Sequence, residues 1–225
     1  MRKPMKHLHF KELPSTQLKA IELIEEHNSI LISAQKQTQG RGRRDNNWED
    51  LENSLAFSFN ISPTGKPTLL ALEIAITLAK YFDEDNLSLK WPNDIYNEKG
   101  KKVIGILVNK EGDDYIIGIG INYGPVTKST HNNYGQLKSG HLLNEEEYKT
   151  LPEQIYKYIC ENRLNDHDII SKWSRLSFHI NQKCKVIDGD EIITGTFEGI
   201  GEYGEALIKN GDKIEKAYTG SLLLD

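Results

Sequence analysis

The stretch Gly40-Arg41-Gly42-Arg43-Arg44-Asp45-Asn46-Asn47-Trp48 places three arginines and two glycines within five residues, with an indole after them. Glycine lets the backbone approach a ligand closely and adopt positive φ. Arginine presents a rigid fork of donors that matches carboxylate and phosphate oxygens. The stretch therefore predicts a flexible cationic loop for an anionic, nucleotide-like ligand. Because Arg/Gly runs with aromatic residues also bind single-stranded nucleic acid, an RNA-binding module is an alternative.

Strand patterns lie on both sides of this loop. Residues 30–32 form a short apolar run that leads into it, and residues 54–61 alternate apolar and polar side chains after it. Residues 8–13 alternate in the same way. Ser15 offers a hydroxyl N-cap for a helix over residues 18–24. The N-terminal part of the chain thus predicts strands of one sheet with a helix between the first two.

The middle of the chain continues this pattern. Residues 67–79 are apolar nearly all round, which is typical of a helix buried against a sheet. Residues 87–91, 103–108 and 115–121 read as strands, and acidic, glycine-containing turns separate them. Such turns join neighbouring strands, so we predict that the three strands form an antiparallel meander. Residues 122–142 are polar and predict a long loop.

Two helical patterns follow over residues 144–162 and 166–177, and the character of the chain then changes to short strands and tight turns. Asn210-Gly211 between two such strands predicts a hairpin. We therefore predict an α+β fold in two domains: residues 1–179 form a mixed β-sheet with helices packed on it, and residues 180–225 form a small β-barrel.

Composition restricts the function. A formal net charge of −5 argues against a nonspecific nucleic-acid binder, because such proteins carry a basic surface. No apolar run approaches the roughly 20 residues of a membrane span, and residues 1–6 contain no apolar signal-peptide core. Cys160 and Cys184 stand apart without metal-ligand spacing. These features predict a cytoplasmic protein with reduced thiols, no membrane segment and no structural metal.

Three further segments each have a functional and a structural interpretation. Residues 90–94 read Lys-Trp-Pro-Asn-Asp, which fits a ligand site or a turn that ends a strand. Gly105 interrupts the β-branched run 103–108, and a glycine inside a strand often marks the close approach of a ligand. Alternation over residues 118–122 sends two glycines and an asparagine to one face. That face is either a ligand slot or a tight crossing beneath a helix.

Together these motifs resemble those of the biotin–protein ligases, over almost the whole chain from Leu8 onward. The matching motifs, in chain order, are Ser15-Thr16, Gln37 with Gly40-Arg41-Gly42-Arg43-Arg44 and Trp48, Lys90-Trp91-Pro92-Asn93-Asp94, Lys102 with Gly105-Ile106-Leu107, and Gly118 to Asn122. The resemblance implies a mixed sheet with helices on one side, followed by an SH3-like barrel.

The resemblance also implies an activity. Biotin and MgATP would give biotinoyl-5′-AMP and pyrophosphate, and the biotinoyl group would then pass to a lysine of a biotin carboxyl carrier protein, as in a biotin–[acetyl-CoA-carboxylase] ligase. Biotin and ATP would be substrates, with Mg²⁺ required. A homodimer is a further expectation, since many members of the family dimerise.

Individual residues acquire roles from the same resemblance. Lys102 would be the catalytic lysine that bridges the biotin carboxylate and the α-phosphate, with Arg41 beside it. Biotin would be bound by Ser15, Thr16, Gln17, Gln37, Gly40, Arg41, Gly42, Arg43, Lys102, Gly105 and Gly118. ATP would be bound by Arg43, Arg44, Trp48, Asn93, Asp94, Lys102, Ile106 and Asn122. Three of these, Asn93, Asp94 and Asn122, would organise the nucleotide and its metal, although no metal-ligand set is predicted.

Two departures and two alternatives accompany this interpretation. The family usually has glycine where this chain has Asp45, and asparagine where it has Gln17. A lipoate–protein ligase or octanoyltransferase shares the expected fold and is the first alternative. A biotin-responsive repressor is the second. Longer relatives carry an N-terminal winged helix, and because only about seven residues precede the first strand here, no DNA binding is expected.

Overall fold

A computed structural model describes residues 5–44, 46–48, 51, 53–125, 133–137 and 139–224, apart from the side chain of Glu84. The strands of a first sheet are β1 (Lys6–Leu13), β2 (Ile30–Gln37), β3 (Ser54–Asn60), β4 (Ser88–Lys90), β5 (Asp94–Tyr96), β6 (Lys102–Glu111) and β7 (Asp114–Asn122). The helices are α1 (Thr16–Leu23), α2 (Leu70–Tyr81), α3 (Glu147–Glu161) and α4 (Asp166–Leu176). The strands of a second sheet are β8 (Lys183–Asp188), β9 (Glu191–Ile200), β10 (Ala206–Asn210), β11 (Lys213–Ala217) and β12 (Ser221–Leu224).

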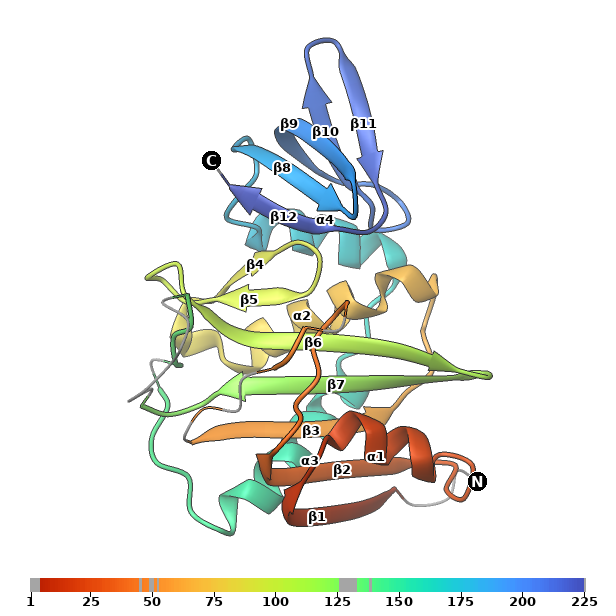
Figure 1. The fold of residues 1–225 in the computed structure, drawn as a ribbon, viewed down its shortest axis with the longest axis vertical. Coiled ribbons are helices and arrows are strands. Elements are labelled where there is room, and N and C mark those ends of the chain that lie inside the picture. The colour runs from red at the N-terminus through yellow and green to blue at the C-terminus, as the bar shows by residue number, and fades with distance from the viewer. Residues whose placement is uncertain are drawn as a thin grey trace.

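The first sheet is mixed, as predicted. Its strand order is β1-β2-β3-β7-β6-β5-β4 (Figure 1). Strands β1 and β2 run parallel, and α1 supplies the crossover that a parallel pair needs. The other neighbouring pairs are antiparallel. The two longest strands, β6 and β7, lie side by side in the middle of the sheet, where they can carry a site on their exposed face.

Helices cover both faces of this sheet, which corrects the expectation of helices on one side. In Figure 1, α1 lies in front of the sheet and α2, α3 and α4 lie behind it. The sequence of β2 explains the arrangement. Leu31 belongs to the large core under α2 and α3, whereas Ile30 and Ile32 pack with Ala20 and Ile24 of α1. Strand β2 is therefore apolar on both faces and can carry a helix on each.

The predicted three-stranded meander is in fact four-stranded. Strand β5 lies between β4 and β6, so these two strands are not neighbours. Asp94 of β5 pairs with Lys90 on one side and Gly105 on the other. Sequence periodicity missed β5 because three residues just after a proline are too few to show alternation. The consequence is that residues 90–94, interpreted as a turn or a site, connect two paired strands.

The second sheet is antiparallel, with the order β11-β10-β9-β8-β12. The predicted Asn210-Gly211 hairpin joins β10 and β11, and Gly211 has a φ of 61°. The prediction of a mixed α+β unit followed by a small all-β unit is confirmed. Trp91 ties the two units together, since its buried indole Nε1 donates to the Gly204 carbonyl oxygen at 2.9 Å.

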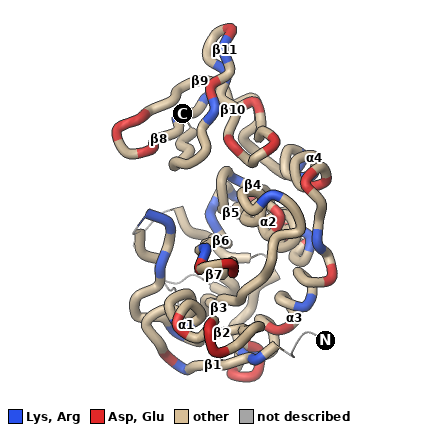
Figure 2. The backbone as a smooth tube through the Cα atoms, turned by 90° about the vertical axis from the view of Figure 1, so that its right-hand side faces the viewer, with Lys and Arg blue, Asp and Glu red and all other residues tan. Residues whose placement is uncertain are grey.

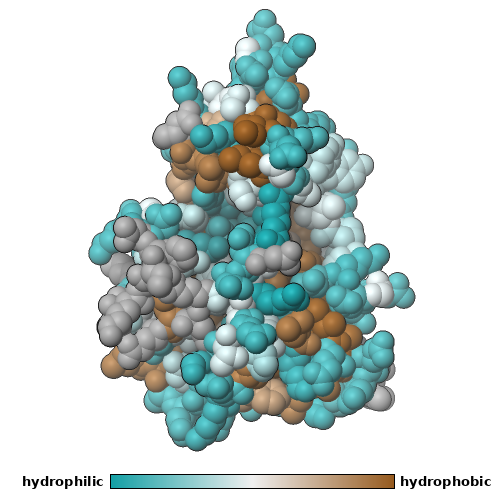
Figure 3. All heavy atoms as spheres, in the orientation of Figure 1, coloured by the Kyte–Doolittle hydropathy of each residue, from teal (hydrophilic) through white to brown (hydrophobic). Residues whose placement is uncertain are grey.

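The face of the molecule seen in Figure 1 is mainly hydrophilic, with a group of apolar side chains on the second sheet and smaller groups over the larger unit below it (Figure 3). Within the described part of the chain, no helix combines the length and apolar character that crossing a membrane requires.

A buried ion pair joins the helices behind the sheet. Glu73 of α2 is 2% exposed, and its two carboxylate oxygens accept from Nε and Nη2 of Arg163 at 2.7 and 2.9 Å. Arg163 lies between α3 and α4, and the backbone N–H of Leu164 also donates to Glu73. The pair therefore ties the connection between α3 and α4 to α2. Removal of either charge would leave its partner buried and uncompensated.

We expect Arg163→Ala to lower the free energy of unfolding by about 3 kcal/mol, since the Glu73 carboxylate would stay buried without its cation. Urea denaturation monitored by circular dichroism measures this change. Arg175→Ala on the exposed side of α4 is the control, with an expected change within about 0.5 kcal/mol. Equal stabilities for the two variants would contradict a structural role for the pair.

Candidate active site

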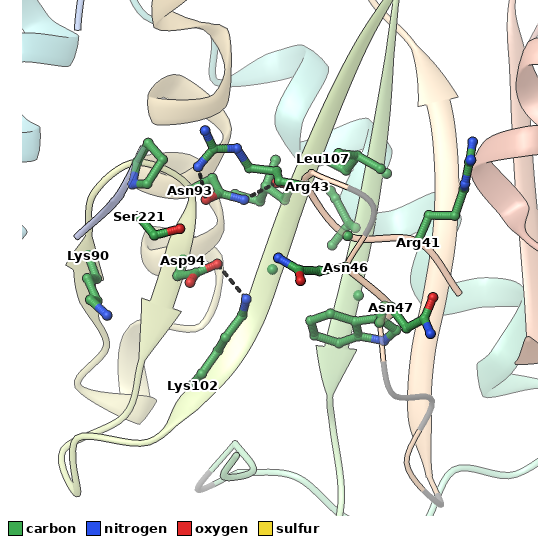
Figure 4. A pocket seen from close by; sticks show the side chains of 18 of the residues that line it. Arg41, Arg43, Asn46, Asn47, Lys90, Asn93, Asp94, Lys102, Leu107 and Ser221 are labelled. Atoms are coloured by element: carbon green, nitrogen blue, oxygen red, sulfur yellow. Dashed lines mark hydrogen bonds and ion pairs between the residues drawn. The ribbon is translucent and has the colours of Figure 1, made fainter. Parts of the chain in front are cut away.

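A cleft of about 610 Å³ opens on the face of the first sheet that carries α1. It is bounded by the start of α1, the loop of residues 40–48, strands β4 to β7 and the start of β12 (Figure 4). The residues predicted from the sequence to form a site line this one cleft, except for Gly40, Arg44 and Asn122. Motifs scattered over more than a hundred residues thus meet at a single place.

The 40–48 loop folds back on itself as a narrow hairpin. The Trp48 N–H donates to the Gly40 carbonyl at 2.9 Å, and the Gly42 N–H donates to the Asn46 carbonyl at 2.7 Å. A Cβ on Gly40 would lie 2.7 Å from the Trp48 carbonyl oxygen. Gly40 therefore makes room for the returning arm of the loop rather than for a ligand.

Arg41 was predicted to lie beside Lys102, and the structure places it elsewhere. Arg41 pairs with Asn47 across the hairpin, and its guanidinium extends away from Lys102 (Figure 4). The alternation of side chains in the two arms explains this direction. Asp45, the departure from the usual glycine, lies outside the described residues.

Trp48 occupies a slot formed by strand glycines. A Cβ on Gly105 of β6 would lie 2.7 Å from Cζ3 of the indole, and one on Gly120 of β7 would also collide with the ring. These two glycines are paired across β6 and β7, so they form one bare patch of sheet. The indole is 9% exposed and closes the floor of the cleft. The predicted slot on the glycine face of β7 is present, and Trp48 fills part of it.

Contacts of both its side chain and its backbone hold Lys102 in place. Its Nζ lies 2.6 Å from Oδ1 of Asp94 and 5.5 Å from the centre of the Trp48 ring. Figure 4 shows the lysine reaching across the cleft toward Asp94. Asn122, which does not line the cleft, donates from Nδ2 to the Lys102 carbonyl oxygen at 3.3 Å. Asn122 thus supports the backbone that carries the lysine.

Lys90 is a second lysine of the cleft, and it was not among the predicted site residues. Its Nζ lies 5.3 Å from the centre of the Tyr96 ring. Burial lowers the pKa of Lys90, nearby Asp94 opposes that shift, and the charge of Lys102 adds to it. Both lysines lie near a single carboxylate, that of Asp94, so positive charge exceeds negative charge in the cleft. The signal was available, because Lys90 opens the motif of residues 90–94.

A polar pocket lies at the start of α1. The Thr16 backbone N–H donates to Oε1 of Gln37 at 2.9 Å, and the Thr16 hydroxyl lies 2.9 Å from the Ser58 hydroxyl. Ser15 caps α1. Ser58 was missed, although alternation along β3 turns it away from Phe57 and Phe59 and toward this pocket.

Gln17 forms one wall of the same pocket. It donates from Nε2 to the Ile116 carbonyl oxygen at 3.0 Å, while its buried Oε1 has no hydrogen-bond partner among the described residues. A Cβ on Gly118 would lie 2.5 Å from that Oε1. Gly118 therefore accommodates the longer amide that this chain carries at position 17.

The two remaining arginines of the loop point toward the second sheet. Arg43 donates from Nη1 to Oδ1 of Asn93 and to the Gly220 carbonyl, both at 3.3 Å. Burial lowers the pKa of Arg43, and the charge of neighbouring Arg44 adds to the shift. Arg44, predicted to face phosphates, pairs instead with Asp188 at 2.6 Å. In Figure 2, the basic segment of this loop lies below β8 and to the left of β6.

The described residues contain no group of three or more His, Cys, Asp or Glu side chains that could hold a metal ion. Asp94, one of the residues expected near a metal, is paired with Lys102.

Comparisons with known proteins identify the family of this chain. Residues 9–122 match the model of the biotin/lipoate A/B protein ligase family, and residues 179–224 match the biotin protein ligase C-terminal domain. The chain belongs to the biotin/lipoate A/B protein ligase family. The family resemblance inferred from the sequence motifs is confirmed.

Three relatives illustrate the likeness. The bifunctional ligase/repressor BirA of Escherichia coli is 30% identical over 206 residues, which cover 83% of this chain and 63% of that protein. The biotin protein ligase of Aquifex aeolicus in complex with biotin and ATP superposes with a TM-score of 0.78, at 26% identity, over 97% of this chain and 98% of that one. The biotin acetyl coenzyme A carboxylase synthetase of Helicobacter pylori superposes with a TM-score of 0.70, also at 26% identity, over 93% and 98%.

The glycine slot makes a direct prediction. We expect Gly120→Ala to displace the Trp48 indole, because the added methyl would overlap the ring and such overpacking costs about 1–3 kcal/mol. Fluorine NMR of the protein labelled with fluorotryptophan should show a shifted Trp48 resonance, assigned through Trp48→Phe, with Trp91 and Trp173 unchanged.

Gly118→Ala is the matched control for that measurement. It adds the same methyl to the same face of β7, but the methyl meets Gln17 rather than the indole. The Trp48 resonance should stay in place. An unshifted Trp48 signal in Gly120→Ala would show that the indole does not lie in the slot.

Proposed function

We propose that the protein is an ATP-dependent biotin–protein ligase. The observation that carries the proposal is the position of Lys102, whose ammonium lies in the cleft between Asp94 and Trp48. A polar pocket opens at one end of this cleft, and Arg43 and Asn93 lie at another part of it (Figure 4). The family, and a similar fold that holds biotin and ATP in the Aquifex protein, support the same reading.

In the first step, a carboxylate oxygen of biotin attacks the α-phosphorus of MgATP. A bond forms between that oxygen and phosphorus, the bond from the α-phosphorus to the bridging oxygen breaks, and magnesium pyrophosphate leaves. The products are biotinoyl-5′-AMP and pyrophosphate. Both reactants are anions, so the step needs fixed cations that meet the charge on the transferring group. Lys102 supplies one at the centre of the cleft, and Arg43 and Lys90 add positive charge beside it.

In the second step, the neutral ε-amine of an acceptor lysine attacks the acyl carbon of the intermediate. An amide bond forms, the acyl–oxygen bond breaks, AMP leaves and the amine proton passes to solvent. We propose a biotin carboxyl carrier domain in the cytoplasm as the acceptor, and acetyl-CoA carboxylase as the enzyme that contains it. The name of the Helicobacter protein supports this choice.

The polar pocket favours biotin over lipoate or octanoate. The ureido ring of biotin has N–H and C=O groups that must be paired when they are buried. Thr16, Gln37 and Ser58 present hydroxyl and amide groups at the pocket. Those three side chains bond one another, but the buried Oε1 of Gln17 has no hydrogen-bond partner among the described residues, and a ureido N–H could donate to it whereas a dithiolane ring or an alkyl chain could not.

The decisive experiment offers the purified protein MgATP and a carrier domain with biotin, lipoate or octanoate in separate reactions. Intact-protein mass spectrometry should show the mass of one biotinoyl group on a single lysine of the carrier and no product with the other acids. Transfer of lipoate or octanoate at a comparable rate would replace this proposal with the alternative ligase.

A second prediction concerns Lys102. Lys102→Ala should lower the rate of biotin-dependent pyrophosphate release by about 10²–10³-fold, because it removes a preorganised donor that acts on charge in the transition state. The apparent affinity for biotin should change much less than kcat.

Lys101→Ala is the control, since Lys101 is the preceding residue and does not line the cleft. Its effect on pyrophosphate release should be small, and both variants should retain the circular dichroism spectrum of the parent protein. Near-normal pyrophosphate release by Lys102→Ala would remove that lysine from the chemistry.

A further inference from the structure

The end of β8 and the turn that precedes β12 hold Arg43 and Arg44 of the 40–48 loop. Arg44 donates from Nη2 to Oδ1 of Asp188 at 2.6 Å and from Nη1 to the Ile187 carbonyl oxygen at 3.0 Å. Its Nη2 also lies 3.4 Å from the Thr219 hydroxyl oxygen. A single guanidinium therefore contacts both the end of β8 and the turn that precedes β12.

The end of β8 and the turn that precedes β12 are also joined to each other. The Thr219 hydroxyl donates to Oδ2 of Asp188, so the carboxylate is bound on one oxygen by the loop and on the other by the neighbouring turn. Gly220 follows directly, and its carbonyl accepts from Arg43. A Cβ on Gly220 would lie 2.5 Å from Val186, so the turn fits closely against β8. Asp188 is the residue that contacts both Arg44 and Thr219.

The conformation of the loop depends on this anchor. Arg44 has a φ of 54°, in the left-handed region that a bulky residue adopts only when its surroundings require it. Arg43 and Arg44 are adjacent cations; burial lowers the pKa of Arg43, and the charge of Arg44 lowers it further. The Asp188 carboxylate offsets that repulsion before any anionic ligand arrives. Without the Asp188 carboxylate, Arg44 would lose its ion pair, and the two arginines would lose the negative charge that offsets their repulsion.

We propose that Asp188 and Thr219 form a latch that holds the 40–48 loop against the second sheet and so keeps the loop in place over a ligand bound in the cleft. Both are positioning residues, since they act through Arg44 and touch no reacting atom. The consequence for catalysis rests on the proposed ligase function: an open latch would let biotinoyl-5′-AMP leave before transfer. Arg44 thus anchors the loop, while Arg43 faces the cleft.

The first test does not depend on activity. Amide hydrogen exchange of residues 40–48 is measured in the ligand-free protein and in Asp188→Asn, which keeps the size of the side chain and removes its charge. Exchange should become about two- to tenfold faster, the range expected for a partly exposed charged contact. Asp190→Asn removes the same charge two residues further on, in the exposed turn after β8, and should leave exchange unchanged. Equal exchange in the two variants would overturn the latch.

A double-mutant cycle identifies the partner. Arg44→Gln alone should raise loop exchange as Asp188→Asn does, and the double variant should show little further increase, because both changes remove one contact. Additive effects would mean that Asp188 acts on the loop by another route and would overturn the proposal. If Asp188→Asn also lowers the melting temperature, Thr219→Val replaces it, and loop exchange must still rise.

The second test measures release of the intermediate. With biotin and MgATP but no acceptor, Asp188→Asn should release biotinoyl-5′-AMP into solution about two- to tenfold faster than the parent protein, while Asp190→Asn should match the parent. Unchanged release together with faster loop exchange would overturn the retention role. A parent protein that forms no biotinoyl-5′-AMP would refute the ligase proposal itself, and the exchange experiment would still decide whether the latch exists.

Discussion

The close contact between the Trp48 indole and the bare backbone of β6 and β7 is the constraint on which the rest of the site depends. Only glycine at positions 105 and 120 lets the ring lie flat against the sheet. The ring in turn fixes the returning arm of the loop and forms one side of the space that Lys102 occupies. A larger residue at either glycine would move the loop, the indole and the lysine together.

Electrostatics imposes the second constraint. The chain as a whole is acidic, yet its cleft gathers Lys90, Lys102 and Arg43 around one carboxylate, Asp94. Concentrating cations in a half-buried space is unfavourable until anions arrive: the pKa of Lys90 is lowered mainly by burial and further by the charge of Lys102. The cleft therefore attracts a ligand with several negative charges. The local excess of cations in the cleft decides this, and the net charge of the whole chain does not.

Sequence reasoning succeeded where the information was local. Alternation along β3 and β7 placed their apolar residues in the core, and the apolar run of α2 predicted its buried position. The ordered motifs identified the family and most of the residues that line the cleft. Reasoning failed where contacts between distant segments decide the outcome. The direction of Arg44 depends on Asp188, 144 residues further along the chain. Ser58 and β5 are intermediate cases, since each had a weak local signal.

The contact between Arg43 and Gly220 joins residues 177 positions apart, and the Trp91–Gly204 hydrogen bond spans 113. Bringing together segments this far apart costs chain entropy that only the surrounding structure can offset. Local pairs such as the β6–β7 hairpin carry a smaller cost, which favours their early formation. Chain connectivity therefore favours formation of the β6–β7 part of the cleft before the long-range contacts that cover it. A chain arrested between these stages would display the cationic, glycine-lined surface openly, where any passing polyanion could bind it.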